Sequence, residues 1–407
     1  MNHTETRFQV DLRKILIFGA GKIGRSFIGQ LFGNGGYRIV FVDVDASIVD
    51  LLNTHRSYRV VIKGDHDSEI VVNNVQAISG RDTDKVAEEV ATAGILAVSV
   101  GKNALEKVIP VIAKGLKKRF YYEPACPLDI IIAENMRDAS DFMKEHLKAN
   151  LPADFPVETF VGLVETSIGK MVPIMTSADL EKDPLMVFAE PYNTLILDGK
   201  GFKSPIPDLK GLAPKENIKA WVDRKAFIHN LGHATAAYYG YYKHPEAIFM
   251  YEILEDKEVY SFTRLVMVQS AVTLSKIYHS DYSLDDLLEH IDDLLARFRN
   301  KALKDTIYRV GSDLTRKLGF DDRFMGALGL AGLIGTNCDM ILEAMSYGLF
   351  FDAKDETGNC FPPDVKFLQS IGKDFDLAMT ELLSLDPVKD SYVIVKLKEF
   401  YLAKQTP

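Results

Sequence analysis

Three polar side chains lie at short intervals in the second half of the chain, where they could act together on one substrate. They are Lys225, Asn230 and His233, within residues 224–233. Successive residues of an α-helix are turned by about 100°, which places Asn230 about 140° and His233 about 80° around the axis from Lys225. All three groups can therefore reach one pocket, where an amine, an amide and an imidazole can accept protons and donate hydrogen bonds. A solvated polar face is the alternative interpretation of such a helix.

A glycine-rich segment near the start of the chain could bind the phosphates of a dinucleotide. It follows the apolar run Ile15–Phe18 and reads Gly19-Ala20-Gly21-Lys22-Ile23-Gly24. In such a strand–turn–helix unit the first glycine permits the tight turn, the second lets the backbone approach the pyrophosphate, and the third lets helix and strand pack closely. A bare pattern of this kind also occurs in turns without a ligand, but its place between a strand and a helix favours a cofactor loop.

Asp43 closes the next apolar run, Ile39–Val42, and lies 19 residues after Gly24. A carboxylate at this place accepts hydrogen bonds from the ribose hydroxyls and repels a 2′-phosphate. Asp45 follows, and no arginine stands directly after Asp43. The sequence therefore predicts NAD, rather than NADP, as the cofactor.

The first half of the chain alternates short apolar runs with helical patterns. The runs are Ile15–Phe18, Ile39–Val42, Ile70–Val72, Ile95–Val100, Ile130–Ala133 and Phe160–Val164. Continuous apolar runs of this length are typical of a parallel sheet buried on both faces, so we expect an α/β, Rossmann-type doubly wound domain. We assign it to residues 1–205, with the Pro- and Gly-rich segment Pro191–Pro214 as a linker or crossover.

From about Asn217 onward, long stretches with a 3.6-residue period dominate. They are Ile218–Tyr242, Val259–Tyr278, Leu284–Phe298, Phe324–Tyr347 and Phe375–Leu383. This periodicity predicts a mostly α-helical C-terminal domain, residues 206–407, as the substrate and catalytic domain. In the first domain, the basic residues within 114–119, Arg119 among them, are predicted to form the solvated end of a surface helix.

The composition is that of a globular protein, with 47% hydrophobic and 26% charged residues in a chain of 407, which fits two domains. A formal net charge of −9 disfavours a nucleic-acid-binding protein, whose surface must be basic. The three cysteines form no Cys-x-x-Cys pair, so neither a disulfide framework nor a cysteine zinc site is expected. The first 13 residues are polar and no later apolar run reaches the ~18 residues of a membrane span, which predicts a cytoplasmic protein without a membrane partner.

Residues 224–238 carry the motif that identifies a family. The spacing Lys-x4-Asn-x2-His, with Gly232, Ala234 and Ala237-Tyr238, resembles the signature helix of the polyol-specific long-chain dehydrogenases, the mannitol dehydrogenase family. Further matching blocks are Phe18-Gly19-Ala20-Gly21, Ile23-Gly24-Arg25, Phe27-Ile28-Gly29, Val100-Gly101, Ala113-Lys114-Gly115-Leu116, Ala133-Glu134-Asn135-Met136, Asp183-Pro184-Leu185, Arg297-Phe298-x-Asn300, Leu303-Lys304-Asp305, Arg309-Val310-Gly311, Arg316-Lys317-Leu318 and Asp322-Arg323. Their order and spacing together favour membership over a chance match.

The resemblance implies a metal-independent hydride transfer between NAD and a polyol or its phosphate. Oxidation of an alcohol needs a base that takes the hydroxyl proton. In this family the lysine is that base, so Lys225 is expected to serve as one and to need a lowered pKa. Asn230 is expected to donate to the oxygen whose charge develops, and His233 to orient the substrate. The likeness within the family and the chain length imply interconversion of mannitol 1-phosphate and fructose 6-phosphate.

Five further positions follow from the resemblance. Arg309 and Lys317 match positions that bind substrate hydroxyl or acid groups, and Val100, Gly101 and Asn135 match positions that line the cofactor. Alternatively, Arg309 and Lys317 are solvated cations near a turn. The three other positions are then loop residues that bind no ligand.

Two features depart from the family pattern. Where the family carries an acidic residue and an arginine, this chain has Gly169 and Lys170, which exchanges a forked guanidinium for a point-charge ammonium. An enzyme for another polyol or for a hexuronate therefore stays open as the alternative function. His229 and His233 have the i, i+4 spacing of a helical zinc site, but the glutamate of a metallohydrolase is missing, so no metal is expected.

A non-catalytic NAD-binding sensor is a remoter alternative, and the oligomeric state, monomer or dimer, stays open.

Overall fold

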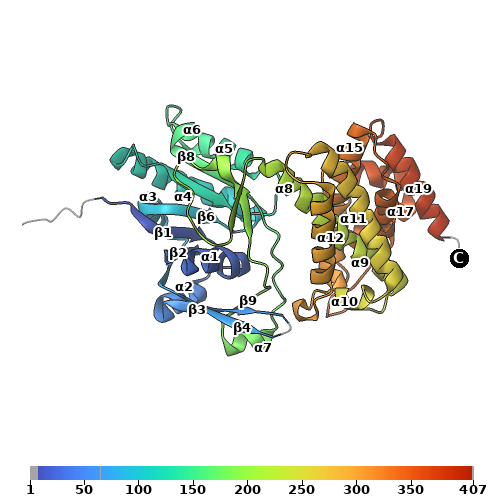
Figure 1. Ribbon diagram of the computed structural model, residues 1–407, viewed down its shortest axis with the longest axis horizontal. Helices are drawn as coiled ribbons and strands as arrows, with labels where there is room; N and C mark the ends of the chain where they lie inside the picture. The colour runs from blue at the N-terminus through green and yellow to red at the C-terminus, as the bar shows by residue number, and fades with distance from the viewer. Residues whose placement is uncertain (1–7, 65, 406–407) are drawn as a thin grey trace, which may run out of the picture. The chain divides into compact units, whose positions relative to one another are not determined.

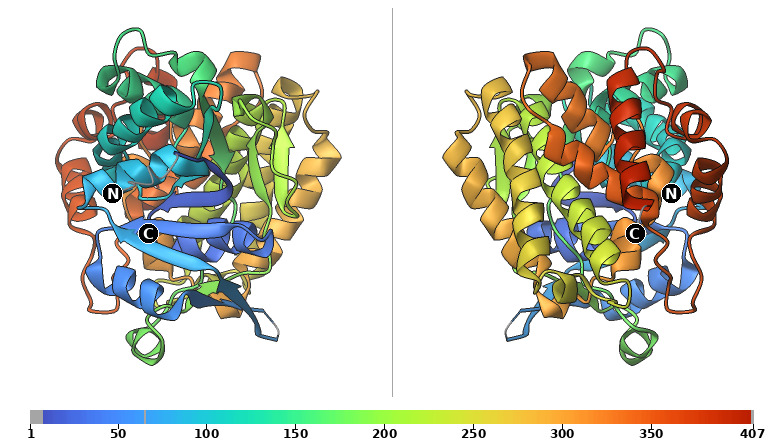
Figure 2. Two further views of the ribbon diagram at one scale, coloured as in Figure 1. Left: turned by 90° about the vertical axis from the view of Figure 1, so that its left-hand side faces the viewer. Right: turned by 90° about the vertical axis from the view of Figure 1, so that its right-hand side faces the viewer.

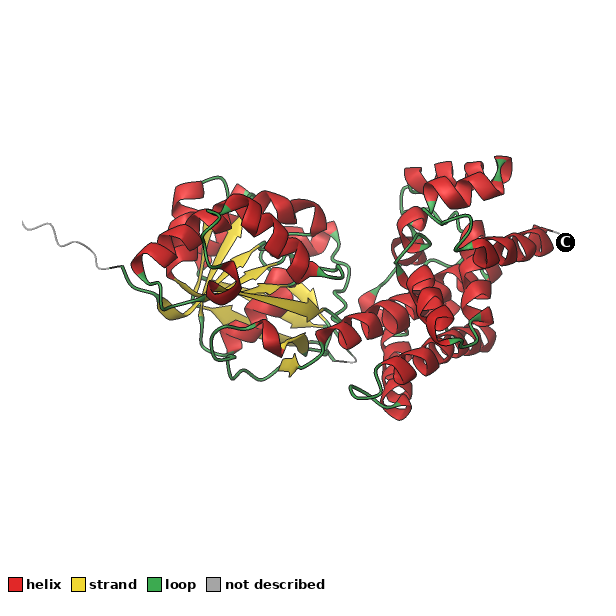
Figure 3. Ribbon diagram, turned by 90° about the horizontal axis from the view of Figure 1, so that it is seen from above, coloured by secondary structure: helices red, strands yellow, loops and turns green. Residues whose placement is uncertain are grey.

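The computed structural model describes residues 8–64 and 66–405, and its contacts divide the chain into two units, Met1–Ile218 and Lys219–Pro407 (Figure 1). The described strands lie in the first unit, where helices flank the sheet on both sides, and the second unit consists of helices and their connections (Figure 3). The predicted fold class, an α/β domain followed by a mostly helical domain, is confirmed.

Eight strands form the main sheet of the first unit, in the order β11-β10-β8-β7-β6-β1-β2-β5. Their bounds are β1 Asp11–Phe18, β2 Arg38–Asp43, β5 Val75–Ser79, β6 Ala93–Val98, β7 Leu128–Ile132, β8 Val161–Ser167, β10 Leu195–Asp198 and β11 Leu212–Lys215. The strands from β5 to β8 in this order all pair in parallel. Strand order reverses between β1 and β6, and such a reversal is the point at which doubly wound sheets bind ligands.

Both faces of this sheet are covered, as the continuous apolar runs predict. In β1, Ile15 and Ile17 belong to one buried cluster and Leu16 and Phe18 to another. The first cluster includes side chains of the π-helical turn η1 (Gly24–Gly29), α1 (Gln30–Asn34) and α2 (Ala46–His55). The second includes side chains of α3 (Thr83–Thr92), α4 (Lys102–Tyr122), α5 (Ala139–Asn150) and α6 (Val157–Phe160). Strands buried on both sides are apolar at successive positions because neither face meets water.

A second sheet contains β3 (Ser57–Ile62), β4 (Ser68–Asn73) and β9 (Val187–Ala189), in the order β4-β3-β9. The run Ile70–Val72, predicted as a strand of the main sheet, lies here and pairs with β3 in antiparallel register. That prediction was wrong because three apolar residues do not specify a partner strand. Val71 is exposed and Val72 buried, so one face of β4 meets solvent.

The segment Pro191–Pro214, predicted as a linker or crossover, is no linker: it contains β10 and most of β11 of the main sheet, and its chain crosses over between these two parallel strands. Its apolar residues Leu195–Leu197 are buried in β10, which pairs with β8 on one side and β11 on the other. Residues 206–218, assigned to the second domain from the sequence, therefore lie in the first unit. Proline is tolerated in this segment because it occurs between the strands and in β11 at the edge of the sheet.

Arg119 is buried inside the first unit rather than solvated. Its guanidinium donates hydrogen bonds to the carbonyl oxygens of Ala91 and Ala93 at 3.1 and 2.5 Å, and of Cys126 and Pro127 at 2.8 and 3.0 Å. These carbonyls lie outside the helix that carries Arg119, so the helical charge pattern alone could not reveal them.

The second unit is helical, and the right-hand view of Figure 2 faces it. Its helical segments are α8 Ile218–Arg224, η3 Lys225–Asn230, α9 Leu231–Lys243, α10 Met250–Ile253, α11 Lys257–Ile277, α12 Leu284–Phe298, η4 Lys301–Leu303, α13 Ile307–Gly311, α14 Leu314–Lys317, α15 Arg323–Ile334, α16 Asp339–Tyr347, η5 Gly348–Phe350, α17 Pro362–Lys373, α18 Phe375–Leu377, η6 Ala378–Leu382 and α19 Ser391–Gln405. The single stretch predicted over Phe324–Tyr347 is two helices, because Gly335 ends α15 in a left-handed conformation with φ +66°. Helix α9 packs against α11, α13 and α16. In the described part of the chain, no helix combines the length and apolar character that a membrane crossing requires.

Candidate active site

The glycine-rich loop lies at the carboxyl edge of the main sheet, where four strands end in register. Phe18 pairs with both Val42 and Val98, and Val98 pairs with Ile132. The residues that follow these four strand positions are Gly19, Asp43, Ser99 and Ala133. The register therefore brings the loop, the predicted ribose carboxylate and the three predicted cofactor-lining residues to one edge of the sheet.

Two of the loop glycines are required by the backbone and one is not. Gly19 has φ +93°, and a Cβ at this position would lie 2.5 Å from the carbonyl oxygen of Ser99. A Cβ on Gly24 would lie 2.0 Å from the carbonyl oxygen of Gly19. A Cβ on Gly21 would meet no atom within 4 Å, and Gly21 and Lys22 are exposed. The open face at Gly21 fits a pyrophosphate that approaches the backbone at a helix N-terminus.

Asp43 joins this loop to the end of β2. Its Oδ2 accepts a hydrogen bond from the amide of Ala20 at 2.7 Å, and its Oδ1 accepts one from the amide of Asp45 at 3.0 Å. Each carboxylate oxygen has a second lone pair, so the ribose hydroxyls can be bound at the same time. Ile23 packs against the core beneath the loop. Asp43 thus also holds the loop in shape, a role that the sequence did not indicate.

Arg25 fixes the far side of the loop and was given no role from the sequence. It is 7% exposed and donates from Nε to the carbonyl oxygen of Ala20 at 2.7 Å. Its Nη1 donates to the carbonyl oxygen of Leu185 at 2.6 Å. Its own carbonyl oxygen accepts a hydrogen bond from the hydroxyl of Tyr58 at 2.8 Å. The loop is therefore held from both ends before any ligand binds.

Glu134 holds the loop after β6 and was also given no role. Its Oε1 accepts hydrogen bonds from the amides of Val100 at 2.7 Å and Gly101 at 2.9 Å. Burial raises the pKa of Glu134, and the two amides oppose that rise. Gly101 has φ +86°, and Asn135, next to Glu134, is exposed at the same edge. One buried carboxylate thus connects all three residues predicted to line the cofactor.

Lys170, which replaces the family's arginine, is buried in the first unit. Its Nζ donates to Oδ1 of Asn193 at 2.6 Å and to Oε1 of Gln30 at 3.2 Å, and it lies 5.0 Å from the centre of the Phe27 ring. Burial lowers the pKa of Lys170 to about 7, and Glu190 opposes this. Because Phe27 and Gln30 follow the glycine loop, Lys170 packs against the helical segment that this loop begins.

In the second unit, Lys225 and Asn230 lie at the two ends of a π-helical turn, η3. The amide of Leu231 donates to the carbonyl oxygen of Ala226, five residues earlier. Hydrogen bonds of this i→i+5 kind widen the turn and bring residues five apart closer to one face than an α-helix does. The segment therefore differs from the α-helix assumed from the sequence, in the direction that brings Lys225 and Asn230 together.

Arg323, at the start of α15, lies beside this turn. Its Nη1 lies 3.4 Å from the carbonyl oxygen of Asn230, and its Nε donates to Oδ1 of Asp322 at 2.9 Å. Lys225 is half-buried, and its pKa is lowered to about 8 by burial first and by the charge of Arg323 second, with Asp322 opposing. A lysine with this pKa can act as a proton acceptor near neutral pH.

His233 lies one turn further along, stacked on Phe298 with ring centres 4.4 Å apart and planes 9° apart. Burial lowers the pKa of His233 well below its ordinary value, as do the charges of Arg309, Lys317 and Arg323. The imidazole is therefore neutral at physiological pH. Its Nε2 lies 3.5 Å from Oδ2 of Asp305, which the sequence left without a role.

Arg309 and Lys317 lie on α13 and α14. Arg309 is half-exposed, whereas Lys317 is buried and donates from Nζ to the carbonyl oxygen of Val310 at 2.5 Å. Burial lowers the pKa of Lys317 to about 7, with Arg323 adding to the effect. Asp364, on α17, anchors α14 because its carboxylate accepts hydrogen bonds from the amides of Asp313 at 2.9 Å and Leu314 at 2.7 Å.

His229 is buried, with its ring 5.4 Å from that of Phe298 and 6.2 Å from that of His233. Within residues 8–64 and 66–405, no group of three or more histidine, cysteine, aspartate or glutamate side chains is placed to hold a metal ion.

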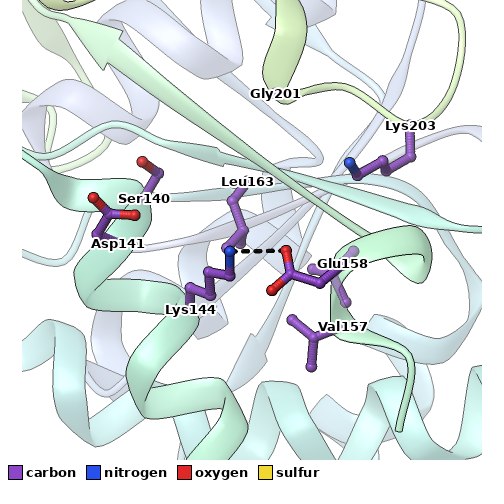
Figure 4. A pocket seen from close by; sticks show the side chains of 9 residues that line it. Ser140, Asp141, Lys144, Val157, Glu158, Leu163, Gly201 and Lys203 are labelled. Carbon is purple, nitrogen blue, oxygen red and sulfur yellow. Dashed lines mark ion pairs between the residues drawn. The ribbon is translucent and has the colours of Figure 1, made fainter.

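A small hollow of about 160 Å³ lies elsewhere in the first unit, between α5, α6 and β8 (Figure 4). Lys144 and Glu158 form an ion pair of 2.8 Å beside it, and Lys203 reaches it from the other side. None of the predicted site residues is among those that line it.

Comparison with known proteins gives matches of the same kind in both units. The sequence profile of the mannitol dehydrogenase Rossmann domain matches residues 13–211, and that of the mannitol dehydrogenase C-terminal domain matches residues 217–383. The chain is 33% identical over 341 residues to a mannitol-1-phosphate 5-dehydrogenase of Brevibacillus brevis, covering 83% of this chain and 86% of that protein.

Two solved structures share the fold. A ternary complex of Pseudomonas fluorescens mannitol 2-dehydrogenase with NAD and D-mannitol matches with a TM-score of 0.76 at 16% identity, covering 100% of this chain and 93% of that one. A substrate-free D-sorbitol dehydrogenase matches with a TM-score of 0.76 at 15% identity, covering 98% and 96%. The two profiles together span most of the chain, which confirms the resemblance found in the sequence: the chain belongs to the mannitol dehydrogenase family of oxidoreductases.

Proposed function

We propose that this chain is an NAD-dependent polyol-phosphate dehydrogenase that interconverts mannitol 1-phosphate and fructose 6-phosphate, with Lys225 as the general base. The observation that carries the proposal is the state of Lys225, an amine with a pKa of about 8 beside Arg323, on the helical segment that also bears Asn230 and His233. A positioned base with a pKa near the working pH is what alcohol oxidation requires.

Each residue of this segment has a distinct task. The neutral amine of Lys225 takes the proton of the substrate hydroxyl, and Asp322, whose charge raises the pKa of Lys225, favours the ammonium that results. Asn230 donates a hydrogen bond to the same oxygen as its charge develops. His233, neutral and held in plane by Phe298, orients a neighbouring hydroxyl. A dinucleotide held by the loop from Gly19 to Gly24 would supply the acceptor for the hydride of the carbinol carbon. No metal is needed, since Lys225 supplies the proton acceptor and Asn230 the polarising dipole.

The proposed cofactor is NAD because Asp43, at the end of β2 and bonded to the loop amide of Ala20, would accept hydrogen bonds from ribose hydroxyls and would repel a 2′-phosphate. The glycine loop from Gly19 to Gly24 would hold the pyrophosphate, and Val100, Gly101 and Asn135 would line the remaining length of the dinucleotide. The alignment of these residues at one edge of the sheet supports this assignment.

A phosphorylated substrate agrees with the charges around the proposed site. Arg309 and Arg316 are half-exposed cations, and Lys317 and Arg323 of the same unit are buried. A phosphate monoester brings about two negative charges, which bidentate arginine contacts recognise well. The relative from Brevibacillus brevis carries mannitol 1-phosphate in its name, which also supports this choice.

A substrate panel tests the proposal. The protein is mixed with NAD and, in turn, mannitol 1-phosphate, mannitol, sorbitol and sorbitol 6-phosphate, and with NADH and fructose 6-phosphate or a hexuronate, while NADH absorbance is followed. We expect the highest kcat/KM with mannitol 1-phosphate in oxidation and fructose 6-phosphate in reduction. A higher value with a free polyol or a hexuronate would replace the proposed substrate, and no turnover with any of them would favour a sensor.

A further inference from the structure

Asp305 lies buried just before α13, between two residues of the proposed site. Its Oδ1 accepts a hydrogen bond from Nε of Arg309 at 2.6 Å, and its Oδ2 lies 3.5 Å from Nε2 of His233. Among the described residues, neither Oδ2 of Asp305 nor Nε2 of His233 has a hydrogen-bond partner, although protein encloses both atoms. An unpaired buried polar atom destabilises the fold. We therefore expect Oδ2 of Asp305 and Nε2 of His233, which lie 3.5 Å apart, to interact with each other.

The positions of both groups are fixed by other parts of the second unit. The carbonyl oxygen of Asp305 accepts a hydrogen bond from the amide of Met250 at 2.9 Å. The hydroxyl of Thr306 caps α13 by accepting from the amide of Arg309 at 3.2 Å. Stacking on Phe298 fixes the plane of the His233 ring. With backbone and ring plane held, the variable that remains is which ring nitrogen of His233 carries the proton.

The charge states of Asp305 and His233 determine which ring nitrogen of His233 carries the proton. Burial raises the pKa of Asp305, and the charge and hydrogen bond of Arg309 oppose this rise. His233 is neutral, because burial and the surrounding cations lower its pKa. The Arg309 guanidinium, which donates to Oδ1 at 2.6 Å, favours the ionised form of Asp305. A neutral imidazole has one N–H, and an ionised carboxylate only accepts hydrogen bonds. The proton therefore belongs on Nε2, facing Asp305, which leaves Nδ1 as an acceptor.

We propose that Asp305 is a positioning residue that holds the Arg309 guanidinium and fixes His233 as the Nε2–H tautomer, so that Nδ1 accepts the hydrogen of a substrate hydroxyl. The proposal rests on the function proposed above for the identity of that substrate. Because the Asp305 carboxylate performs both tasks, it links His233, which orients a substrate hydroxyl, to Arg309, which contacts the substrate anion. Hydrogen bonds of this kind are often long without substrate and shorten when it binds.

The kinetic test uses Asp305→Asn, which keeps the size of the side chain but adds an amide donor toward His233. We expect kcat/KM for the polyol phosphate to fall by about 10²-fold, the usual effect of a misplaced catalytic group, while KM for NAD and the Tm change little. Because Asp305 also holds Arg309, Asp305→Asn combined with His233→Ala should lose more activity than His233→Ala alone, but clearly less than the product of the two single losses. Asp292→Asn, which breaks an exposed pair with Arg264 of 2.8 Å in the same unit, is the matched control and should leave kcat/KM unchanged.

Additive losses in the double variant, or an equal rise in KM for NAD, would show a general structural effect and overturn the proposal. A second measurement does not depend on activity. In ¹⁵N spectra of imidazole-labelled protein, the signals missing from His233→Ala identify His233, and we expect the Nε2–H pattern in the native chain. An Nδ1–H pattern would overturn the role of Asp305 even if Asp305→Asn fails to fold. Absence of polyol-phosphate oxidation by the native protein would refute the proposed function but would not alter this spectrum.

Discussion

Replacement of Lys225 should remove both the rate and the pH dependence of alcohol oxidation. With a pKa of about 8, about one molecule in ten carries a neutral Lys225 amine at pH 7, whereas an ordinary lysine would be neutral in about one in three thousand. The lowered pKa therefore increases the fraction of molecules with a neutral Lys225 amine at pH 7 roughly 300-fold. We expect kcat/KM for oxidation to rise about tenfold per pH unit below pH 8 and to level off above it.

Lys225→Ala should lower kcat by about 10²–10⁴-fold and flatten this rise, since a positioned general base contributes that much. Lys225→Arg keeps a cation but cannot lose its proton, so it should be equally slow at every pH. Small primary amines added to Lys225→Ala should restore part of the rate. Lys219→Ala, which removes an exposed lysine of α8, is the matched control and should behave as the native protein does.

The assay follows NADH absorbance from pH 6 to pH 10 and measures NADH affinity separately by fluorescence. Lys225 is not part of the unit that carries the glycine loop, so NADH affinity should be nearly unchanged. Near-normal turnover of Lys225→Ala with an unaltered pH profile would refute Lys225 as the base.

Four further outcomes are expected. Asp43→Ser should lower kcat/KM with NAD and reduce the ratio of kcat/KM with NAD to kcat/KM with NADP, because the carboxylate that repels a 2′-phosphate also binds the loop. A native protein that uses NADP as well as NAD would contradict this. Glu134→Gln should raise KM for NAD several-fold, since the amides of Val100 and Gly101 lose a carboxylate acceptor; an unchanged KM with a lowered kcat would argue against it. Lys225→Met should raise the Tm at pH 7, and this gain should disappear toward pH 10.5. Because its pKa is lowered to about 8, Lys225 holds fewer protons in the folded than in the unfolded state between about pH 8 and 10.5. The native protein therefore gains stability as pH rises through that window, while Lys225→Met does not. A constant gain across pH would contradict that linkage. Exhaustive treatment with a chelator should leave activity intact, and activity that is lost and then returns with zinc would refute the metal-free mechanism.

Short-range patterns in the sequence were sufficient for the fold class and for the backbone role of the glycine-rich loop. Apolar runs such as Ile15–Phe18 predict strands buried on both faces, and the 3.6-residue period predicts the helices of the second unit. Gly19 and Gly24 have the local backbone roles expected of them, since the clashes that require glycine there involve neighbouring atoms of one βα unit and the adjacent strand. The roles of Lys225, Asn230 and His233 stay predictions that the experiments above test.

The sequence was a weaker guide where the partner of a segment had to be known. Ile70–Val72 is apolar like a central strand but pairs in a second sheet, and Leu195–Leu197 extends the main sheet although prolines surround it. Arg119 fits the charge pattern of a solvated helix end, yet it is buried among four carbonyl oxygens. Helical and strand periods describe which face is apolar, but they do not specify what covers that face.

What the sequence by itself determined is therefore the order of the elements, the glycine loop and the presence of an amine, an amide and an imidazole on one helical segment. Only the tertiary structure decided their chemical state. The widened turn brings Lys225 toward Asn230, and Arg323 and burial together lower the pKa of Lys225. Glu134 accepts a hydrogen bond from Val100, and Asp305 lies 3.5 Å from His233, although both partners are distant in the chain. Protonation and hydrogen bonding depend on desolvation and on charges within a few ångströms, and these neighbours are assembled by the fold rather than by proximity in sequence.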